Sequence, residues 1–111
     1  MSESDRIRLQ HISEAAQKAL RFIDGRRRED LDTDEQLLFA VIRALEVLGE
    51  AAVKLSPEAR SRFPEVPWSQ VIGMRNRLIH AYDDVNRDIV WATVTRFLPP
   101  LVATLEKGLA P

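Results

Sequence analysis

The sequence predicts an all-α protein, an antiparallel bundle of four long helices plus a short connecting helix. Apolar residues recur every three or four positions through nearly the whole chain, and no stretch alternates like a half-buried strand. Residue types that begin and end helices stand at the borders of these periodic segments. Because the chain has 111 residues, we expect one domain that spans residues 1–111.

Two long helices are predicted in the first half of the chain. The first closes near Asp24 and Gly25, and its inner face is expected to hold Ile7, Ile12, Ala15, Ala16, Ala19, Phe22 and Ile23. A charged connector of residues 26–32 follows. Thr33 and Gln36 have the spacing of a capping box, so we expect Thr33 to open the second helix. That helix ends near Leu55, with an inner face of Leu37, Leu38, Val41, Ile42, Leu45, Leu48, Gly49 and Ala52.

The second half of the chain predicts a short helix, an extended link and two further long helices. Ser56 followed by Pro57 indicates a capped start of the short helix, which reaches Phe63. Pro64 and Pro67 disfavour helix in the link. The next helix begins near Pro67 or Trp68 and turns Val71, Ile72, Leu78 and Ile79 inward. After a break at residues 83–86, Asp84 or Asn86 caps the last helix, which has a kink at Pro99 and Pro100 and an inner face of Ile89, Val90, Val94, Phe97, Leu101 and Leu105.

Composition excludes several classes of protein. The absence of cysteine excludes a disulfide framework, a thiol nucleophile and a thiolate metal site. No apolar stretch approaches the roughly 20 residues that span a bilayer, and the polar start is unlike a signal peptide. We therefore expect a cytoplasmic protein without a membrane partner.

The net charge of −1 means that whole-molecule electrostatics would not attract nucleic acid. Affinity for RNA would need a local basic patch, for which the candidates are Arg60, Arg62, Arg75, Arg77 and Arg87. Arg26–Arg28 form a separate basic turn, which we interpret as solvated side chains paired with nearby acids.

The polar segment from Arg75 to Tyr82 differs from this regular background. On a helix, Asn76 and Arg77 lie one turn before His80. Arg75 precedes His80 by five residues, which places the two about 140° apart around the helix. One straight helix cannot aim both at the same atom unless the arginine side chain wraps around or the helix end unwinds. A second copy of the chain, paired by symmetry, would also bring them together.

These residue types suit cleavage of RNA without a metal. Histidine exchanges protons near neutral pH, and arginine presents a planar fork of donors to phosphate. A base would deprotonate a ribose 2′-hydroxyl for attack on phosphorus, which leaves a cyclic phosphate and a 5′-hydroxyl. An arginine and a histidine at this spacing also occur by chance. A helix histidine without an evident partner, such as His11, is interpreted as structural.

The run from Trp68 to Tyr82 resembles the signature of the HEPN superfamily, in particular its HepT-like branch. The motif of that branch is an arginine, four to six residues, a histidine and a tyrosine two positions beyond, which here are Arg75, His80 and Tyr82. The segments 48–52, 89–91 and 97–99 are similar to the second and last helices of the family, so the resemblance covers most of the chain.

The resemblance implies a HEPN-like all-α homodimer whose two motifs meet near the dimer interface. It implies the toxin of a type VII-like toxin–antitoxin pair, a ribonuclease with Arg75 and His80 as catalytic residues and Asn76 in support. No metal and no cofactor are expected, and Arg77 and Arg87 are expected to bind the RNA substrate. The implied partner is an MntA-type minimal nucleotidyltransferase, an antitoxin that silences the toxin by transferring AMP from ATP to Tyr82.

Several alternatives stay open at this point. The chain could be a non-catalytic helical dimer that binds the nucleotidyltransferase partner. It could also be a metal enzyme that uses His80 with Asp83 or Asp84, although that ligand set is thin. Modification of Tyr82 requires an exposed side chain, whereas a tyrosine here could also be buried against the last helix. Glu50 could orient a catalytic side chain or pair with an arginine, and we favour the pairing.

Overall fold

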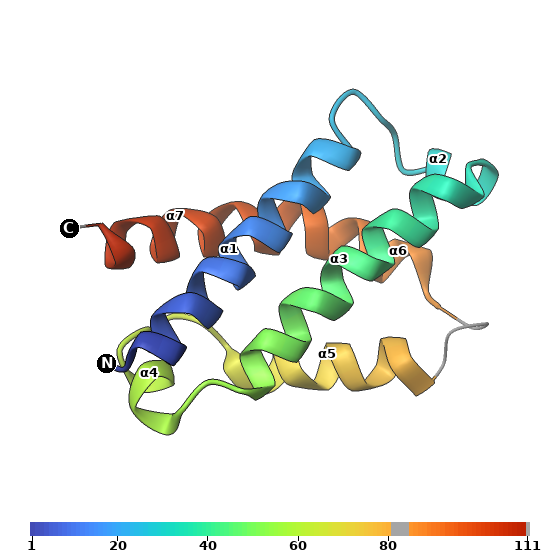
Figure 1. Ribbon diagram of the computed structural model, residues 1–111. Helices are drawn as coiled ribbons and strands as arrows, with labels where there is room; N and C mark the ends of the chain where they lie inside the picture. Colours follow the sequence, from blue (N-terminus) through green and yellow to red (C-terminus); the bar gives the residue numbers. More distant parts are fainter. Residues whose placement is uncertain (81–84, 111) are drawn as a thin grey trace.

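The computed structural model describes residues 1–80 and 85–110, and it describes only the main chain of Ile79 and His80. Every regular element in this part of the chain is a helix (Figure 1). In chain order these are α1 (Glu3–Phe22), α2 (Asp30–Thr33), α3 (Glu35–Val53), α4 (Pro57–Ser61), α5 (Trp68–His80), α6 (Arg87–Ala92), the π-helical turn η2 (Thr93–Phe97) and α7 (Leu98–Leu109). The predicted all-α class is confirmed, with α6, η2 and α7 forming the fourth long segment.

The core lies where α1 packs against α3 on one side and α7 on the other. The largest fully buried side chains are Leu9, Ile12, Leu31, Leu45, Leu48, Leu98, Leu105, Val41 and Val94. Helix α5 packs mainly against α3, so one side of α5 is fixed to the bundle (Figure 1). None of the described helices combines the length and the apolar content that crossing a membrane requires.

The start of α3 differs from the prediction. Thr33 is the last residue of α2, a short helix inside the charged connector that was not predicted. Asp34 caps α3 instead, since its carboxylate accepts a hydrogen bond from the Leu37 N–H at 3.0 Å. Thr33 and Asp34 are both residue types that cap helices. The negatively charged Asp34 interacts more favourably with the positive end of the helix dipole. The bond from Leu37, followed by one from Arg26, lowers the pKa of Asp34.

The predicted start of the short helix is confirmed. Ser56 Oγ accepts a hydrogen bond from the Ala59 N–H at 3.1 Å, and Pro57 is the first residue of α4. The buried carboxylate of Asp5 on α1 accepts hydrogen bonds from Ser56 Oγ at 2.6 Å and from Ser56 N at 3.0 Å. These bonds lower the pKa of Asp5, because they favour its charged form. They also tie the beginning of α1 to the beginning of α4.

Three residues predicted to face inward are exposed: Ile7 at 41%, Phe22 at 39% and Ile89 at 55%. Ile7 is two residues before the fully buried Leu9, and an ideal helix turns about 200° over two residues. Ile7 therefore lies on the far side of α1. The stripe of a helix that a neighbouring helix buries can be narrower than the stripe of apolar residues in its sequence, so some apolar residues at its edges stay exposed.

The irregularity predicted at Pro99 and Pro100 takes the form of the π-helical turn that directly precedes α7. A proline has no N–H for the carbonyl four residues earlier, and its ring clashes with that carbonyl. The carbonyls concerned are those of Thr95 and Arg96, inside η2. A wider turn at this point keeps the segment helical despite the two prolines.

Candidate functional site

The predicted site lies on the second half of α5. This helix continues without interruption from Trp68 to His80, so Arg75 and His80 leave it about 140° apart. The predicted modification site Tyr82 lies outside the described residues, as do Asp83 and Asp84 of the metal-enzyme alternative. The side chains that the structure describes, which do not include that of His80, contain no group of three or more potential metal ligands.

The base of the Arg75 side chain lies against the main chain of α3 at Gly49. A Cβ atom placed on Gly49 would lie 2.2 Å from Arg75 Cβ and 2.6 Å from Arg75 Cγ. Arg75 Cβ is fixed to the α5 backbone, so no change of rotamer can move it away. Gly49 thus allows α3 and α5 to approach this closely. Any side chain at this position would push the two helices apart. A glycine inside an otherwise strong helix was the sequence signal for such an approach.

The guanidinium of Arg75 is held by its neighbour. Arg75 Nη1 donates a hydrogen bond to Asn76 Oδ1 at 3.1 Å. Arg75 Nε is buried and has no hydrogen-bond partner among the described residues. No described carboxylate forms an ion pair with Arg75, and Glu50 instead lies 3.6 Å from Arg43, which confirms the favoured pairing. The free Nη donors and the full charge of Arg75 therefore suit an anion.

Arg60 does not belong to a basic patch. Its Nη2 donates to the main-chain oxygens of Ala52 at 3.2 Å and Val53 at 3.1 Å. These carbonyls stand in the last turn of α3, where no N–H four residues ahead completes the regular helical hydrogen bonds. Arg60 therefore satisfies the C-terminal end of α3 and links it to α4.

The other candidates of the patch differ in how far their charge is compensated. Arg62 pairs with Glu58 at 3.6 Å, and Arg87 lies 3.8 Å from Asp32. Arg77 is exposed and forms no ion pair with a residue that the structure describes. The uncompensated charge of the predicted patch is thus concentrated at Arg75 and Arg77, both on α5.

The basic turn at Arg26–Arg28 is an ion-pair cluster, as interpreted from the sequence. Its pairs are Arg26 with Asp30 and Asp34, Arg27 with Glu29, and Arg28 with Asp32 and Asp88. The hydrogen bond to Asp88, followed by that to Asp32, raises the pKa of Arg28. This cluster joins the segment around α2 to the start of α6.

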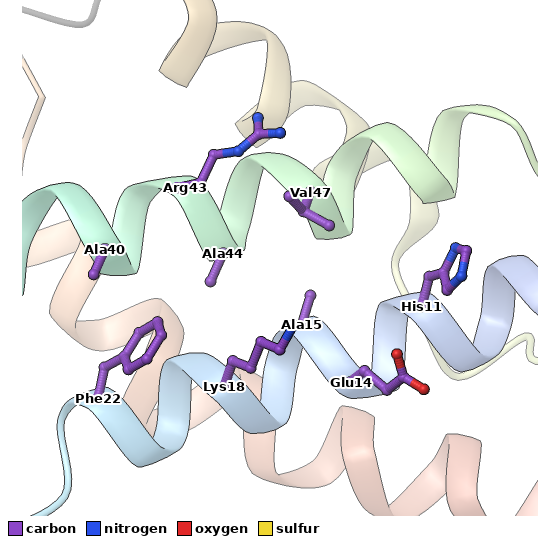
Figure 2. A pocket seen from close by; sticks show the side chains of 9 residues that line it. All are labelled: His11, Glu14, Ala15, Lys18, Phe22, Ala40, Arg43, Ala44 and Val47. Carbon is purple, nitrogen blue, oxygen red and sulfur yellow. The ribbon is translucent and has the colours of Figure 1, made fainter.

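His11 lies apart from the α5 segment. It lines a cavity of about 460 Å³ between α1 and α3, where Figure 2 shows it on α1 together with Glu14, Lys18 and Phe22. No residue of α5 lines this cavity. His11 is exposed and has no hydrogen-bond partner in the described part of the chain. It therefore does not complete the site of Arg75.

Arg77 faces a second hollow, which sequence reasoning missed. Two adjoining cavities of about 170 and 340 Å³ lie between α5 and the α6–η2 segment, and Arg77, Met74, Ile89 and Thr93 line both. Arg96 lines the larger one. No local signal marked Arg96, because its position depends on where the fold places η2 relative to α5.

Comparison with known proteins identifies the family of this chain. The chain matches the family model described as "Ribonuclease HepT-like" over residues 12–108. It is 37% identical to a protein of Thermococcus cleftensis named "Probable ribonuclease HepT", over 96% of this chain and 97% of the relative. A protein of Caldanaerobacter subterraneus subsp. tengcongensis with a provisional RNase name is 36% identical, over 91% of this chain and 90% of the relative. A relative in Methanocaldococcus jannaschii, also with a provisional RNase name, is 33% identical over 88% of this chain and 90% of its own length.

No solved structure matches the chain significantly. The family match covers α1 from Ile12 onward and all later helices up to Gly108. It therefore includes Gly49 on α3 and the whole Arg75–His80 segment on α5. The chain belongs to the HepT-like ribonuclease family.

Proposed function

We propose that this protein is a metal-independent endoribonuclease in which Arg75 binds the reacting phosphate and His80 transfers protons. The observation that carries the proposal is the anchoring of Arg75. Its stem lies against Gly49, its head is hydrogen-bonded to Asn76, and no described carboxylate neutralises it. Such a preorganised cation stabilises charge that develops on a phosphate. The ribonuclease names of the relatives support cleavage of RNA as the activity.

The proposed reaction is an internal transfer of the phosphodiester. A neutral imidazole removes the proton of the ribose 2′-hydroxyl, and the 2′-oxygen forms a bond to phosphorus. The bond from phosphorus to the 5′-oxygen breaks, and an imidazolium donates a proton to that oxygen. Arg75 stabilises the negative charge of the crowded phosphate through its Nη–H groups. The products are a 2′,3′-cyclic phosphate and a 5′-hydroxyl.

We further propose that two copies of the chain build the site. Arg75 and His80 diverge by about 140° on a continuous helix, and their Cα atoms are about 7.5 Å apart along its axis. A two-fold axis beside the ends of the two α5 helices would place Arg75 of one copy near His80 of the other. In each such site the single His80 that accepts the 2′-hydroxyl proton then donates a proton to the leaving oxygen.

A short RNA and a matched oligonucleotide with 2′-deoxyribose at every position test the reaction. With a strong chelator present, the unmodified protein is expected to cleave the RNA to cyclic phosphate ends and to leave the deoxy version intact. Mass spectrometry of the products identifies these ends. Cleavage that requires a divalent cation would contradict the proposal. A protein of confirmed intact mass that cleaves neither oligonucleotide would support the non-catalytic binding alternative.

For regulation, we propose that the protein is the toxin of a pair and that an MntA-type nucleotidyltransferase silences it by transferring AMP to Tyr82. Tyr82 follows His80 by two residues, so an added phosphate would repel the substrate phosphate and occupy its space. Incubation with this partner and ATP is expected to add AMP to wild type and to abolish RNA cleavage. Tyr82→Phe should gain no AMP and stay active. AMP addition to Tyr82→Phe would place the modification elsewhere.

A further inference from the structure

A groove separates α5 from the α6–η2 segment. We define this α5–α6 groove by six of the residues that line it: Met74, Arg77, Ile89, Thr93, Arg96 and Phe97. It exists because α5 is fixed to α3 on one side and diverges from α6 and η2 on the other. The two cavities within it measure about 170 and 340 Å³. Binding sites for small organic groups begin at about 300 Å³, so the groove has room for a nucleotide.

The chemistry of the groove combines an apolar floor with positive charge. Met74 and Phe97 are half-buried, and Ile89 is 55% exposed although it is a large apolar residue. The charged residues among those lining the groove are both arginines, Arg77 and Arg96, and both are exposed. Neither arginine forms an ion pair with a residue in the described part of the chain. A flat apolar base joined to a phosphate complements such a surface.

The groove adjoins the proposed catalytic segment. Arg77 follows Arg75 by two residues, so the two arginines are about 3 Å apart along the axis of α5 and point to different sides of it. Arg75 lies against α3, whereas Arg77 faces the groove. A strand of RNA with one phosphate at Arg75 would therefore cross α5 and enter the groove with its next nucleotide.

We propose that the α5–α6 groove binds the base and phosphate of an RNA nucleotide adjacent to the cleaved bond. Met74, Ile89 and Phe97 contact the base, and Arg77 and Arg96 contact the phosphate. This inference rests on the proposed ribonuclease function, and it assigns Arg96 and Ile89 as residues that bind the substrate beside the cleaved bond.

The test measures binding without cleavage. All variants are made in the His80→Ala protein, and the probe is a short single-stranded RNA, studied by fluorescence anisotropy at several salt concentrations. Arg96→Gln is expected to weaken binding about five- to tenfold and to make the slope of log K against log salt about 0.7 less negative, as for one lost phosphate contact. The matched control Arg21→Gln, also an exposed arginine but on α1, should bind within twofold of the parent.

A second pair of variants tests the base contact. Ile89→Ala is expected to weaken binding of the normal RNA about threefold to tenfold and to leave unchanged the binding of an RNA with an abasic residue at the groove position. An RNA series with one abasic residue at each position in turn identifies that position. The control is Val53→Ala, which truncates an exposed apolar residue of α3 and should bind both probes like the parent.

Two results would overturn the inference. One is binding by Arg96→Gln and Ile89→Ala within twofold of the parent with the same salt dependence. The other is loss of the dimer in sedimentation of Ile89→Ala, which would make the groove an interface between copies of the chain. Either result leaves the proposed function intact if the wild-type protein cleaves RNA. Conversely, weaker binding by the groove variants with no cleavage by wild type would retain the groove and refute the nuclease.

Discussion

Replacing His80 with alanine is expected to lower the rate of RNA cleavage by about 10²–10⁴-fold, the usual contribution of general acid–base catalysis. The melting temperature should change little, because the residue stands at the end of α5. The chain has two histidines, and His11→Ala is the matched control. His11 lies on α1 beside a different cavity, so its variant should cleave like wild type. Initial rates under substrate excess, with chelator present, measure both variants.

An active His80→Ala protein with an intact fold would exclude His80 as the proton-transfer group. A mixture of two inactive variants then tests whether the site is shared. Unfolded together and refolded, His80→Ala and Arg75→Ala chains form mixed dimers in which one of the two composite sites has both residues intact. Recovery of about a quarter of the wild-type rate is expected, because half of randomly formed dimers are mixed and each has one good site. No recovery would mean that each chain uses its own Arg75 and His80.

Replacing Gly49 with alanine is expected to destabilise the protein by about 1–3 kcal/mol, the usual effect of overpacking, and to lower cleavage about 100-fold. The added methyl group would lie 2.2 Å from Arg75 Cβ, so α5 must move away from α3. That movement displaces the phosphate-binding arginine. Gly73→Ala is the matched control on α5, since nothing lies within 4 Å of its new Cβ. Removing a helix glycine there should stabilise the protein by about 1 kcal/mol.

Urea unfolding and steady-state cleavage distinguish these two glycine variants. The expected pattern is opposite shifts in the free energy of unfolding and loss of cleavage in Gly49→Ala alone. Equal activity in the two variants would show that the contact of Arg75 with α3 does not position the guanidinium for catalysis. A Gly49→Ala protein with reduced cleavage but unchanged KM would indicate that the displaced arginine acts in the transition state.

The sequence by itself determined the local structure of this protein. The spacing of apolar residues every three or four positions predicts helices from neighbouring residues alone. For this reason the four long helical segments were predicted correctly. The caps at Ser56 and at Asn86, one of the two residues predicted for the last helix, depend on one side chain and an N–H three residues ahead, so they were also correct. The prediction that Thr33 caps α3 was wrong, because Asp34 is the cap. Threonine and aspartate differ little in their intrinsic preference for the capping position, so the surrounding structure decides which of the two caps the helix.

Only the tertiary structure decided which long-range contacts the charged residues make. An arginine can reach many partners, and its choice depends on which elements the fold brings near. Arg60 thus satisfies the end of α3 instead of joining a basic patch, and Arg28 reaches Asp88, sixty residues away in the chain.

The same reason applies to the candidate site. The spacing of Arg75 and His80 is local, so the sequence contained it. The contact with Gly49 depends on how α5 packs against α3, and the groove that Arg77 and Arg96 share depends on where α5 lies relative to η2. Helical period determines which residues share a face of one helix, whereas packing determines what that face contacts.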